Sequence, residues 1–252
     1  MLLEVRDVTK RFGPVEALRD VRLEIGAAEA VGLIGDNGAG KSTLVKILAG
    51  VYGPSSGTIT FADRAVSFGS PLDARAAGIE MIYQDLALCP DLDVAANIFL
   101  GRELKRRLGP LSLLDRRRMR SGAQDALAEL GAEIEPTREV GTLSGGERQL
   151  VAVARALEFQ PRLFLMDEPT AALSAEKIHV LLELVRQLKA RGVAVLLVSH
   201  RFTDILHVCD RIVVLRQGEV AGELLPHAQP PEKTMAEMHA LMSGNDLEAA
   251  PA

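Results

Sequence analysis

Residues 35–42 read Gly-Asp-Asn-Gly-Ala-Gly-Lys-Ser and follow directly on a short, continuous apolar run at residues 30–34. Such a run is typical of a strand that is buried on both faces. Residues 43–49 have helical composition, and Gly50 is a stop signal for that helix. A strand, a glycine-rich loop and a helix in this order predict an α/β core in which the loop binds an anion.

The glycine-rich loop predicts a phosphate-binding site. Its glycines let backbone N–H groups turn inward toward phosphate oxygens, and the start of the following helix adds partial positive charge. Lys41 would reach the β and γ phosphates of a nucleotide, and the Ser42 hydroxyl would bind Mg²⁺. The alternative, a glycine turn without a ligand, is disfavoured because every fixed position matches. We therefore expect the nucleotide to contact Gly35, Asp36, Asn37, Gly38, Ala39, Gly40, Lys41, Ser42 and Thr43.

Polar residues follow three further strands that are expected in the same sheet. Asp167 and Glu168 come directly after one apolar run, and His200 and Gln84 each end another. Because the carboxyl ends of parallel strands meet at one edge, these side chains should lie near the loop. Asp167 would bind Mg²⁺ together with Ser42 and Gln84, while Glu168 would activate the attacking water, with His200 and Gln84 as further catalytic candidates. The alternatives are a solvated strand end for the two acids and a bystander role for the histidine.

A second glycine-containing segment, Ser144-Gly145-Gly146-Glu147, opens another helical stretch. Ser144 is predicted to cap that helix, with Glu147 completing a capping box. A serine and two glycines at a helix N-terminus also form a good anion site, although this segment brings no lysine and no metal ligand. We therefore expect Ser144, Gly145 and Gly146 to complete the nucleotide site of another copy of the chain. The alternative is a capped helix and nothing more.

The bulk composition is that of an ordinary soluble protein. Over 252 residues, 48% are hydrophobic and 25% charged, and the net charge of -5 provides no global basic field for nucleic acid. No apolar run approaches the roughly 20 residues that cross a bilayer, and Glu4 comes too early for a secretory signal. Cys89 and Cys209 have neither disulfide nor metal spacing. We expect a cytoplasmic protein with no nucleic-acid partner.

The pattern along the chain divides it into a core and an inserted lobe. The core covers about 1–85 and 160–225, and a mostly helical lobe with a loop at Gly109-Pro110 covers about 86–159. Short strands of a side sheet are expected near 58–68 and a closing hairpin near 211–221. The domain should end near residue 244 with a docking helix, followed by a tail at 245–252. One amphipathic helix should bury Ile178, Leu181, Leu182, Val185 and Leu188.

Together, these segments resemble the nucleotide-binding subunit of ABC transporters. Residues 35–42 match the Walker A motif, residues 143–149 the family signature and residues 163–168 Walker B with its catalytic glutamate. Gln84 and His200 lie where the Q-loop and the switch histidine lie, and Phe12 matches the aromatic residue that stacks on adenine. The resemblance runs from about residue 3 to 244. It implies a RecA-like P-loop core with an antiparallel β subdomain and an inserted helical subdomain, and two copies that sandwich two ATP molecules with Mg²⁺.

Residues 78–88, 97–103 and 168–174 resemble the sugar-importing branch of this family, in its single-cassette form of the fructose or ribose type. The resemblance implies an ATPase subunit that drives monosaccharide uptake from the cytoplasmic face of a bacterial inner membrane. Its partners would be a transmembrane permease, a second copy of itself and, indirectly, a periplasmic sugar-binding protein. Alternatives are another cargo, export, or a non-transport ABC ATPase. A catalytically inactive sensor fits less well, because Glu168 and His200 are both present.

Three positions depart from the family pattern. Ser174 stands where the D-loop usually has aspartate, Asp85 follows Gln84 in place of glutamate, and Ala28 replaces a usual glycine. None of these changes removes a group that hydrolysis needs, although Ser174 provides no carboxylate for communication across the dimer.

The stretch from Arg102 to Arg120 is rich in arginine. In the family this stretch belongs to the lobe that faces the permease, so acidic lipid head groups or the permease itself are candidate partners. The sequence slightly favours the alternative, a solvated helix face.

Overall fold

The structure is a computed structural model of the chain and describes all residues except 83–85, 109–110, 159, 170–174 and 245–252. A six-stranded sheet forms its centre, in the order β12-β11-β3-β10-β9-β6. These strands are β3 (Ala30–Ile34), β6 (Ile79–Ile82), β9 (Leu163–Asp167), β10 (Ala194–Val198), β11 (Arg211–Arg216) and β12 (Glu219–Leu224). All neighbouring pairs are parallel except β11 with β12, which form the predicted hairpin.

The central strands are buried on both faces, as the continuous apolar runs predict. Every residue of β3 and β10 is buried. Alternate residues of β3 enter two different cores: Ala30 and Ile34 belong to the core that includes α6 and α7, whereas Val31 and Leu33 belong to the core of the side sheet. This alternation follows from the two-residue period of a strand.

The side sheet is antiparallel, in the order β2-β1-β4-β5. It consists of β1 (Leu3–Phe12), β2 (Val15–Ile25), β4 (Ser56–Phe61) and β5 (Arg64–Val66). Helix α1 (Lys41–Leu48) shares one core with this sheet and with β3, and α2 (Pro71–Ala77) precedes β6. The antiparallel β subdomain and the strands near 58–68 are therefore confirmed.

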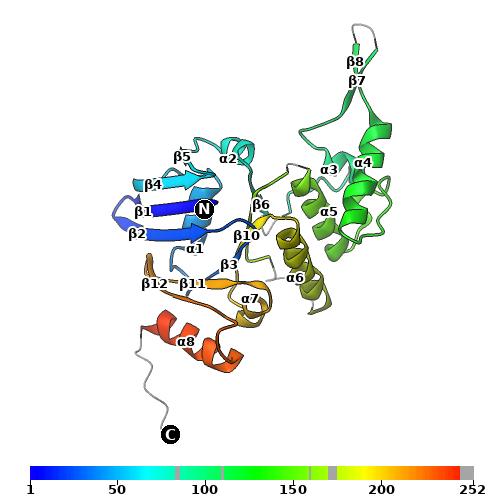
Figure 1. The fold of residues 1–252 in the computed structure, drawn as a ribbon. Coiled ribbons are helices and arrows are strands. Elements are labelled where there is room, and N and C mark those ends of the chain that lie inside the picture. Colours follow the sequence, from blue (N-terminus) through cyan, green and yellow to red (C-terminus); the bar gives the residue numbers. More distant parts are fainter. Residues whose placement is uncertain (83–85, 109–110, 159, 170–174, 245–252) are drawn as a thin grey trace.

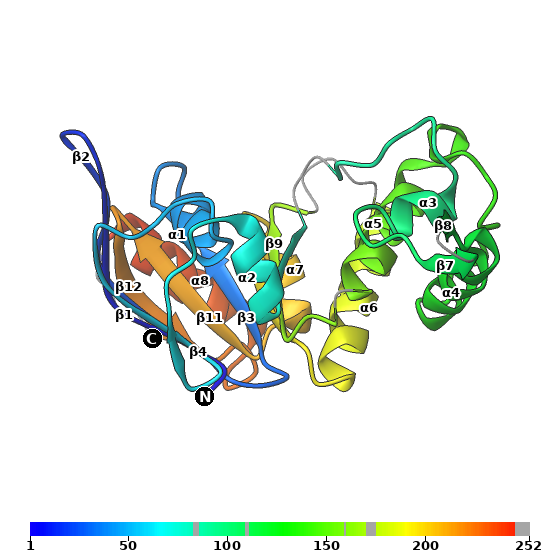
Figure 2. The same cartoon turned by 90° about the horizontal axis from the view of Figure 1, so that it is seen from above.

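The inserted lobe contains α3 (Val94–Ile98), α4 (Arg116–Glu129), a short 3-10 turn (Val140–Thr142) and α5 (Gly145–Leu157). The three α-helices pack against one another and stand beside the central sheet (Figures 1 and 2). Gly122 of α4 lets that helix lie close to Phe99, because an added Cβ would lie 2.8 Å from the Phe99 ring.

One expectation for this lobe is wrong. Residues 105–114 do not continue the helical pattern but form an antiparallel hairpin of β7 (Lys105–Leu108) and β8 (Leu111–Leu114). The hairpin projects away from the rest of the molecule (Figure 1). The physical reason is that a Gly-Pro pair interrupts any helix here and leaves two four-residue runs, which are long enough only to pair with each other. The predicted loop at Gly109-Pro110 lies outside the described residues.

Three further helices complete the fold. The amphipathic helix α6 (Ala175–Ala190) buries all five predicted apolar side chains. Helix α7 (Phe202–Val208) follows β10, and the predicted docking helix α8 (Pro231–Ser243) packs on β11 and β12 with Met238 fully buried. Within the described part of the chain, no helix combines the length and the apolar character that crossing a membrane requires.

Candidate active site

The glycine-rich loop joins β3 to α1 and forms most of the wall of a cavity of about 680 Å³. At two positions of the loop, neighbouring atoms leave no room for a Cβ atom, so only glycine fits. A Cβ on Gly35 would lie 2.2 Å from the Leu215 carbonyl oxygen, and one on Gly40 would lie 2.7 Å from the Ala17 carbonyl oxygen. Gly40 also has a φ of 104° and serves as the N-cap of α1, so the helix N-terminus opens into the cavity. The cavity is lined by Ala17, residues 35–43, Glu168, His200, Phe202 and Met242.

Lys41 is buried and held by the loop that it follows. Its Nζ atom donates hydrogen bonds to the carbonyl oxygens of Gly35 at 2.8 Å and Asp36 at 3.0 Å. An ammonium group has three donors, so one remains for an anion in the cavity. The lysine therefore lies in the cavity wall with one donor to spare, as its predicted phosphate role requires.

Ser42 and Asp167 meet beside the cavity. The Ser42 hydroxyl donates to Asp167 Oδ1 over 3.4 Å, joining the first turn of α1 to the end of β9. Burial raises the pKa of Asp167, and the Ser42 hydrogen bond opposes that rise. A hydroxyl and a carboxylate are both ligands that suit Mg²⁺, which binds one or two carboxylates plus phosphate oxygens and water. No group of three His, Cys, Asp or Glu side chains in the described residues forms a metal site independent of a phosphate.

Glu168 and His200 meet at the same edge of the sheet. Val198 is in register with Asp167, so the residues that follow β10 and β9 lie side by side. His200 Nδ1 is 2.5 Å from Glu168 Oε2, and Nδ1 is the donor whenever the carboxylate is ionised. Glu168 has a φ of 53°, an uncommon conformation for a residue with a side chain, and its N–H donates to the Val198 carbonyl oxygen. Both side chains line the cavity.

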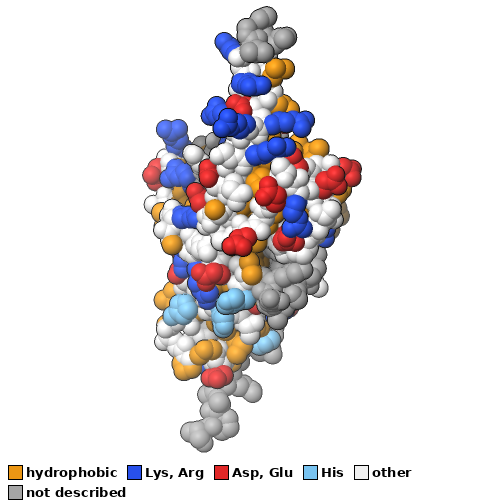
Figure 3. Space-filling model, turned by 90° about the vertical axis from the view of Figure 1, so that its right-hand side faces the viewer, with side chains coloured by type: hydrophobic (Ala, Val, Ile, Leu, Met, Phe, Trp, Pro, Cys, Tyr) orange, Lys and Arg blue, Asp and Glu red, His pale blue; other side chains and the backbone are white. Residues whose placement is uncertain are grey.

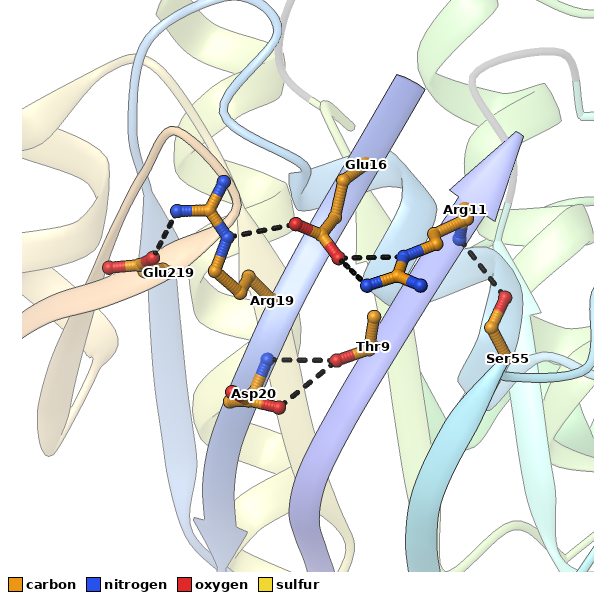
Figure 4. A network of polar contacts seen from close by, with 7 residues as sticks. All are labelled: Thr9, Arg11, Glu16, Arg19, Asp20, Ser55 and Glu219. Carbon is orange, nitrogen blue, oxygen red and sulfur yellow. Dashed lines mark hydrogen bonds and ion pairs between the residues drawn. The ribbon is translucent and has the colours of Figure 1, made fainter. Parts of the chain in front are cut away.

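The expected adenine-stacking residue lies apart from this cavity. Phe12 is 43% exposed and does not line the cavity wall; its ring packs edge-on against Tyr52 at 5.3 Å, with Lys10 Nζ 5.1 Å from its centre. The strands around it are fixed by ion pairs (Figure 4). These join Arg11 to Glu16, Glu16 to Arg19, and Arg19 to Glu219 on β12.

Ser144, Gly145 and Gly146 are not brought to the cavity. They open α5 in the inserted lobe, on the opposite side of the molecule from α1 (Figures 1 and 2). The predicted capping box is present: Ser144 Oγ accepts from the Glu147 N–H at 3.3 Å, and Glu147 Oε2 accepts from the Ser144 N–H at 2.7 Å. The two segments that the sequence predicts to bind anions are thus separate within one chain. Gln84 and Ser174 lie outside the described residues.

Sequence reasoning missed several residues around the site. Ala17, Phe202 and Met242 reach the cavity from β2, α7 and α8, and no local pattern marks them. Arg155 was also missed: it donates to the carbonyl oxygens of Leu86 and Ala87, at 2.8 Å each, and so ties α5 to the segment after β6. The sequence did offer one signal for it, because Arg155 is the single charged residue among the small and apolar residues 150–157.

Comparison with known proteins agrees with this geometry. The family model described as ABC transporter matches residues 18–171, more than half of the chain. A xylose/arabinose import ATP-binding protein of Sulfolobus acidocaldarius is 48% identical over 87% of this chain and 86% of its own. A ribose import ATP-binding protein of Burkholderia pseudomallei is 44% identical over 98% of this chain but only 47% of its own, so the chain spans about half of that relative.

Solved structures give the same result. The crystal structure of a nucleotide-free ATP-binding cassette from an ABC transporter superposes with a TM-score of 0.79 at 26% identity, covering 94% of this chain and 95% of the other. A dimeric bacterial ABC transporter cassette superposes with a TM-score of 0.73 at 25% identity, covering 90% of this chain and all of the other. Family match, relatives and fold coincide, and the chain therefore belongs to the ABC transporter family as one of its ATP-binding cassettes.

Proposed function

We propose that this chain hydrolyses ATP and that hydrolysis drives the import of a monosaccharide. The observation that carries the ATPase proposal is the convergence of Lys41, Glu168 and His200 on one cavity, from three elements far apart in the sequence. Its volume of about 680 Å³ lies within the range of small-ligand sites. A cation, a carboxylate and an imidazole around a helix N-terminus are the groups that phosphoryl transfer to water uses.

Each residue has its own part in the proposed reaction. The loop N–H groups and Lys41 bind the phosphates, and Ser42 and Asp167 would hold Mg²⁺, which supplies neutralisation of phosphate charge when bound. Glu168 accepts a proton from the attacking water and orients it in line with the γ-phosphate. His200 holds the Glu168 carboxylate at 2.5 Å and lines the cavity, where it can donate to a phosphate oxygen. Gln84, as a further metal and water contact, completes the proposed set.

We further propose that the complete site forms between two copies of the chain. The N-terminus of α5, at Ser144, Gly145 and Gly146, does not line the cavity of its own chain. Its backbone N–H groups are nevertheless suited to bind an anion. In a head-to-tail pair, this segment of one copy would cover the γ-phosphate bound by Lys41 of the other. The dimeric solved cassette supports the pairing of two copies.

The cargo and partners follow from the relatives. The names of these proteins refer to import of ribose and of xylose or arabinose, which favours a monosaccharide. We propose that the chain works at the cytoplasmic face of a bacterial inner membrane, with a transmembrane permease and, indirectly, a periplasmic sugar-binding protein. Phe12 is the proposed adenine contact, which requires the nucleotide base to extend beyond the described cavity wall.

The test is Glu168→Gln, which keeps the shape of the side chain but removes its basicity. ATP binding should persist, phosphate release should fall by roughly 10²–10⁴-fold, and an ATP-bound dimer should accumulate. Glu24→Gln, a change of the same type on an exposed residue of β2, should leave turnover unchanged. Phosphate release at the wild-type rate by Glu168→Gln would refute the assignment.

A further inference from the structure

The β7–β8 hairpin and its flanks form a surface that the ATPase proposal does not use. We define the basic arm as residues 102–108 and 111–120, which include both hairpin strands and the first turn of α4. We propose that the basic arm docks on the anionic lipid head groups of a membrane surface. This inference goes beyond the proposed function, and its test needs no nucleotide.

The charge of the arm is opposite to that of the rest of the chain. The arm holds eight Lys and Arg but only two acids, Glu103 and Asp115, a net charge of 8 − 2 = +6. The whole chain has a net charge of -5, so the remaining residues carry -5 − 6 = -11. The arm therefore carries the strongest net attraction to an anionic surface, and this attraction favours an orientation with the arm toward that surface.

The cations of the arm are available for such a partner. All eight are exposed, and seven of them have no ion pair within the described part of the chain: Lys105, Arg106, Arg107, Arg116, Arg117, Arg118 and Arg120. Arg211, by contrast, binds two acids, Glu29 and Glu223. Figure 3 shows Lys and Arg side chains gathered where the hairpin projects. The sequence-based alternative, a solvated helix face, holds for the arginines of α4 but not for Lys105, Arg106 and Arg107, which lie on the hairpin.

The hairpin carries Lys105, Arg106 and Arg107 away from the acidic remainder (Figure 1). A four-residue strand is about 13 Å long. Charges are largely screened beyond about 8 Å at physiological ionic strength. The strands of the hairpin would therefore approach an anionic surface with little repulsion from the rest of the molecule.

Apolar side chains in the arm favour lipid over nucleic acid. Leu113 and Leu114 on β8 are 41% and 45% exposed, and they pair directly with Arg106 and Lys105 on β7. Cations beside exposed leucines suit the boundary between head groups and acyl chains. Nucleic acid would instead favour aromatic side chains for base stacking, and the arm contains none.

Vesicle co-sedimentation tests the proposal with the full chain at about 100 mM salt, where surface charges still act. The wild type should bind vesicles of equal parts phosphatidylglycerol and phosphatidylcholine, and not pure phosphatidylcholine. Each basic residue near such a surface contributes about fivefold to binding. The pair Arg106→Gln/Arg107→Gln should therefore weaken binding by about 25-fold. The pair Arg64→Gln/Lys233→Gln removes the same charge from exposed sites outside the arm and should have little effect.

Three results would overturn the proposal: no binding of the wild type to the anionic vesicles, equal losses for the arm and control pairs, or full binding by the arm pair. A second arm pair, Arg116→Gln/Arg117→Gln on α4, gives the same test if the hairpin pair folds poorly. ATP turnover of the arm variants should remain at the wild-type level. The vesicle assay therefore tests lipid docking and the phosphate-release assay tests the ATPase proposal, and either proposal can fail without the other. Unchanged vesicle binding with lost association to the permease would assign the arm to a protein partner and refute lipid docking.

Discussion

Ser144 combines a structural and a proposed catalytic role, and one substitution separates them. Its hydroxyl caps α5 through a long hydrogen bond of 3.3 Å, whereas the other half of the capping box, at 2.7 Å, uses its backbone N–H and survives any side-chain change. Ser144→Ala should therefore cost about 0.5–1 kcal/mol of unfolding free energy, the low end for a lost cap. Ser144→Asp should cost nothing, because aspartate caps as well as serine and its charge suits the helix N-terminus.

Ser144→Asp, which should not affect stability, should strongly slow ATP hydrolysis. In the proposed dimer, an aspartate at 144 would face the γ-phosphate bound by the other copy. Two like charges about 4 Å apart repel by about 4 kcal/mol at an effective dielectric of 20. Ser144→Asp should therefore weaken the closed dimer, and with it the hydrolysis rate, by about a thousandfold. ATP binding to the single chain should be unchanged, since Ser144 does not line its own cavity.

Three measurements check this prediction: urea unfolding, ATP binding and steady-state phosphate release. Mixing Ser144→Asp with Lys41→Ala adds a sharper control. A mixed dimer contains one site with an intact Lys41 and an intact Ser144, so activity should partly return although each variant alone is inactive. Wild-type hydrolysis by Ser144→Asp, or no recovery in the mixture, would contradict the two-chain site.

Three further changes test the local geometry. Burial raises the pKa of Asp167, so the charged carboxylate destabilises the fold above that pKa, and this destabilisation fades as pH falls through it. Without nucleotide, Asp167→Asn should therefore have a higher melting temperature than the wild type at neutral pH. An equal difference in melting temperature at acid pH would contradict this. Arg155→Met removes two charge-assisted hydrogen bonds and should cost about 2–3 kcal/mol in urea unfolding, with Arg155→Lys recovering about half. Gly40→Ala should cost about 2–4 kcal/mol through strain and a backbone clash, whereas Gly38→Ala, which meets open space, should cost about 1 kcal/mol.

The parts of the fold that the sequence predicted are those with a strong local signal. The fully buried strand β3, its glycine loop and α1 form one uninterrupted pattern. Asp167, Glu168 and His200 could be placed together from the sequence alone, because parallel strands that end in polar residues share an edge. The capping box of α5 is equally local.

The parts that were missed depend on contacts between distant segments. The run Lys105–Leu108 has no alternating pattern and is a strand only because Leu111–Leu114 pairs with it. Met242 reaches the cavity because α8 packs across β11 and β12, a placement that its own sequence does not specify. Arg155 shows the same limit, since its role lies in the two carbonyl groups that it finds on another segment.

The contacts of Lys41 and Glu168 explain why a single copy should be a poor enzyme. Lys41 is bonded to the loop carbonyl groups and Glu168 to His200, so the two groups that should act on the γ-phosphate already have partners within the chain. A triphosphate can offer Lys41 stronger, charged acceptors than carbonyl oxygens. The hydrogen bond from His200 uses one carboxylate oxygen of Glu168, so the other oxygen can accept a proton from the attacking water. The γ-phosphate must still be held within reach of that water and of His200, which is the task proposed for the α5 N-terminus of a second copy.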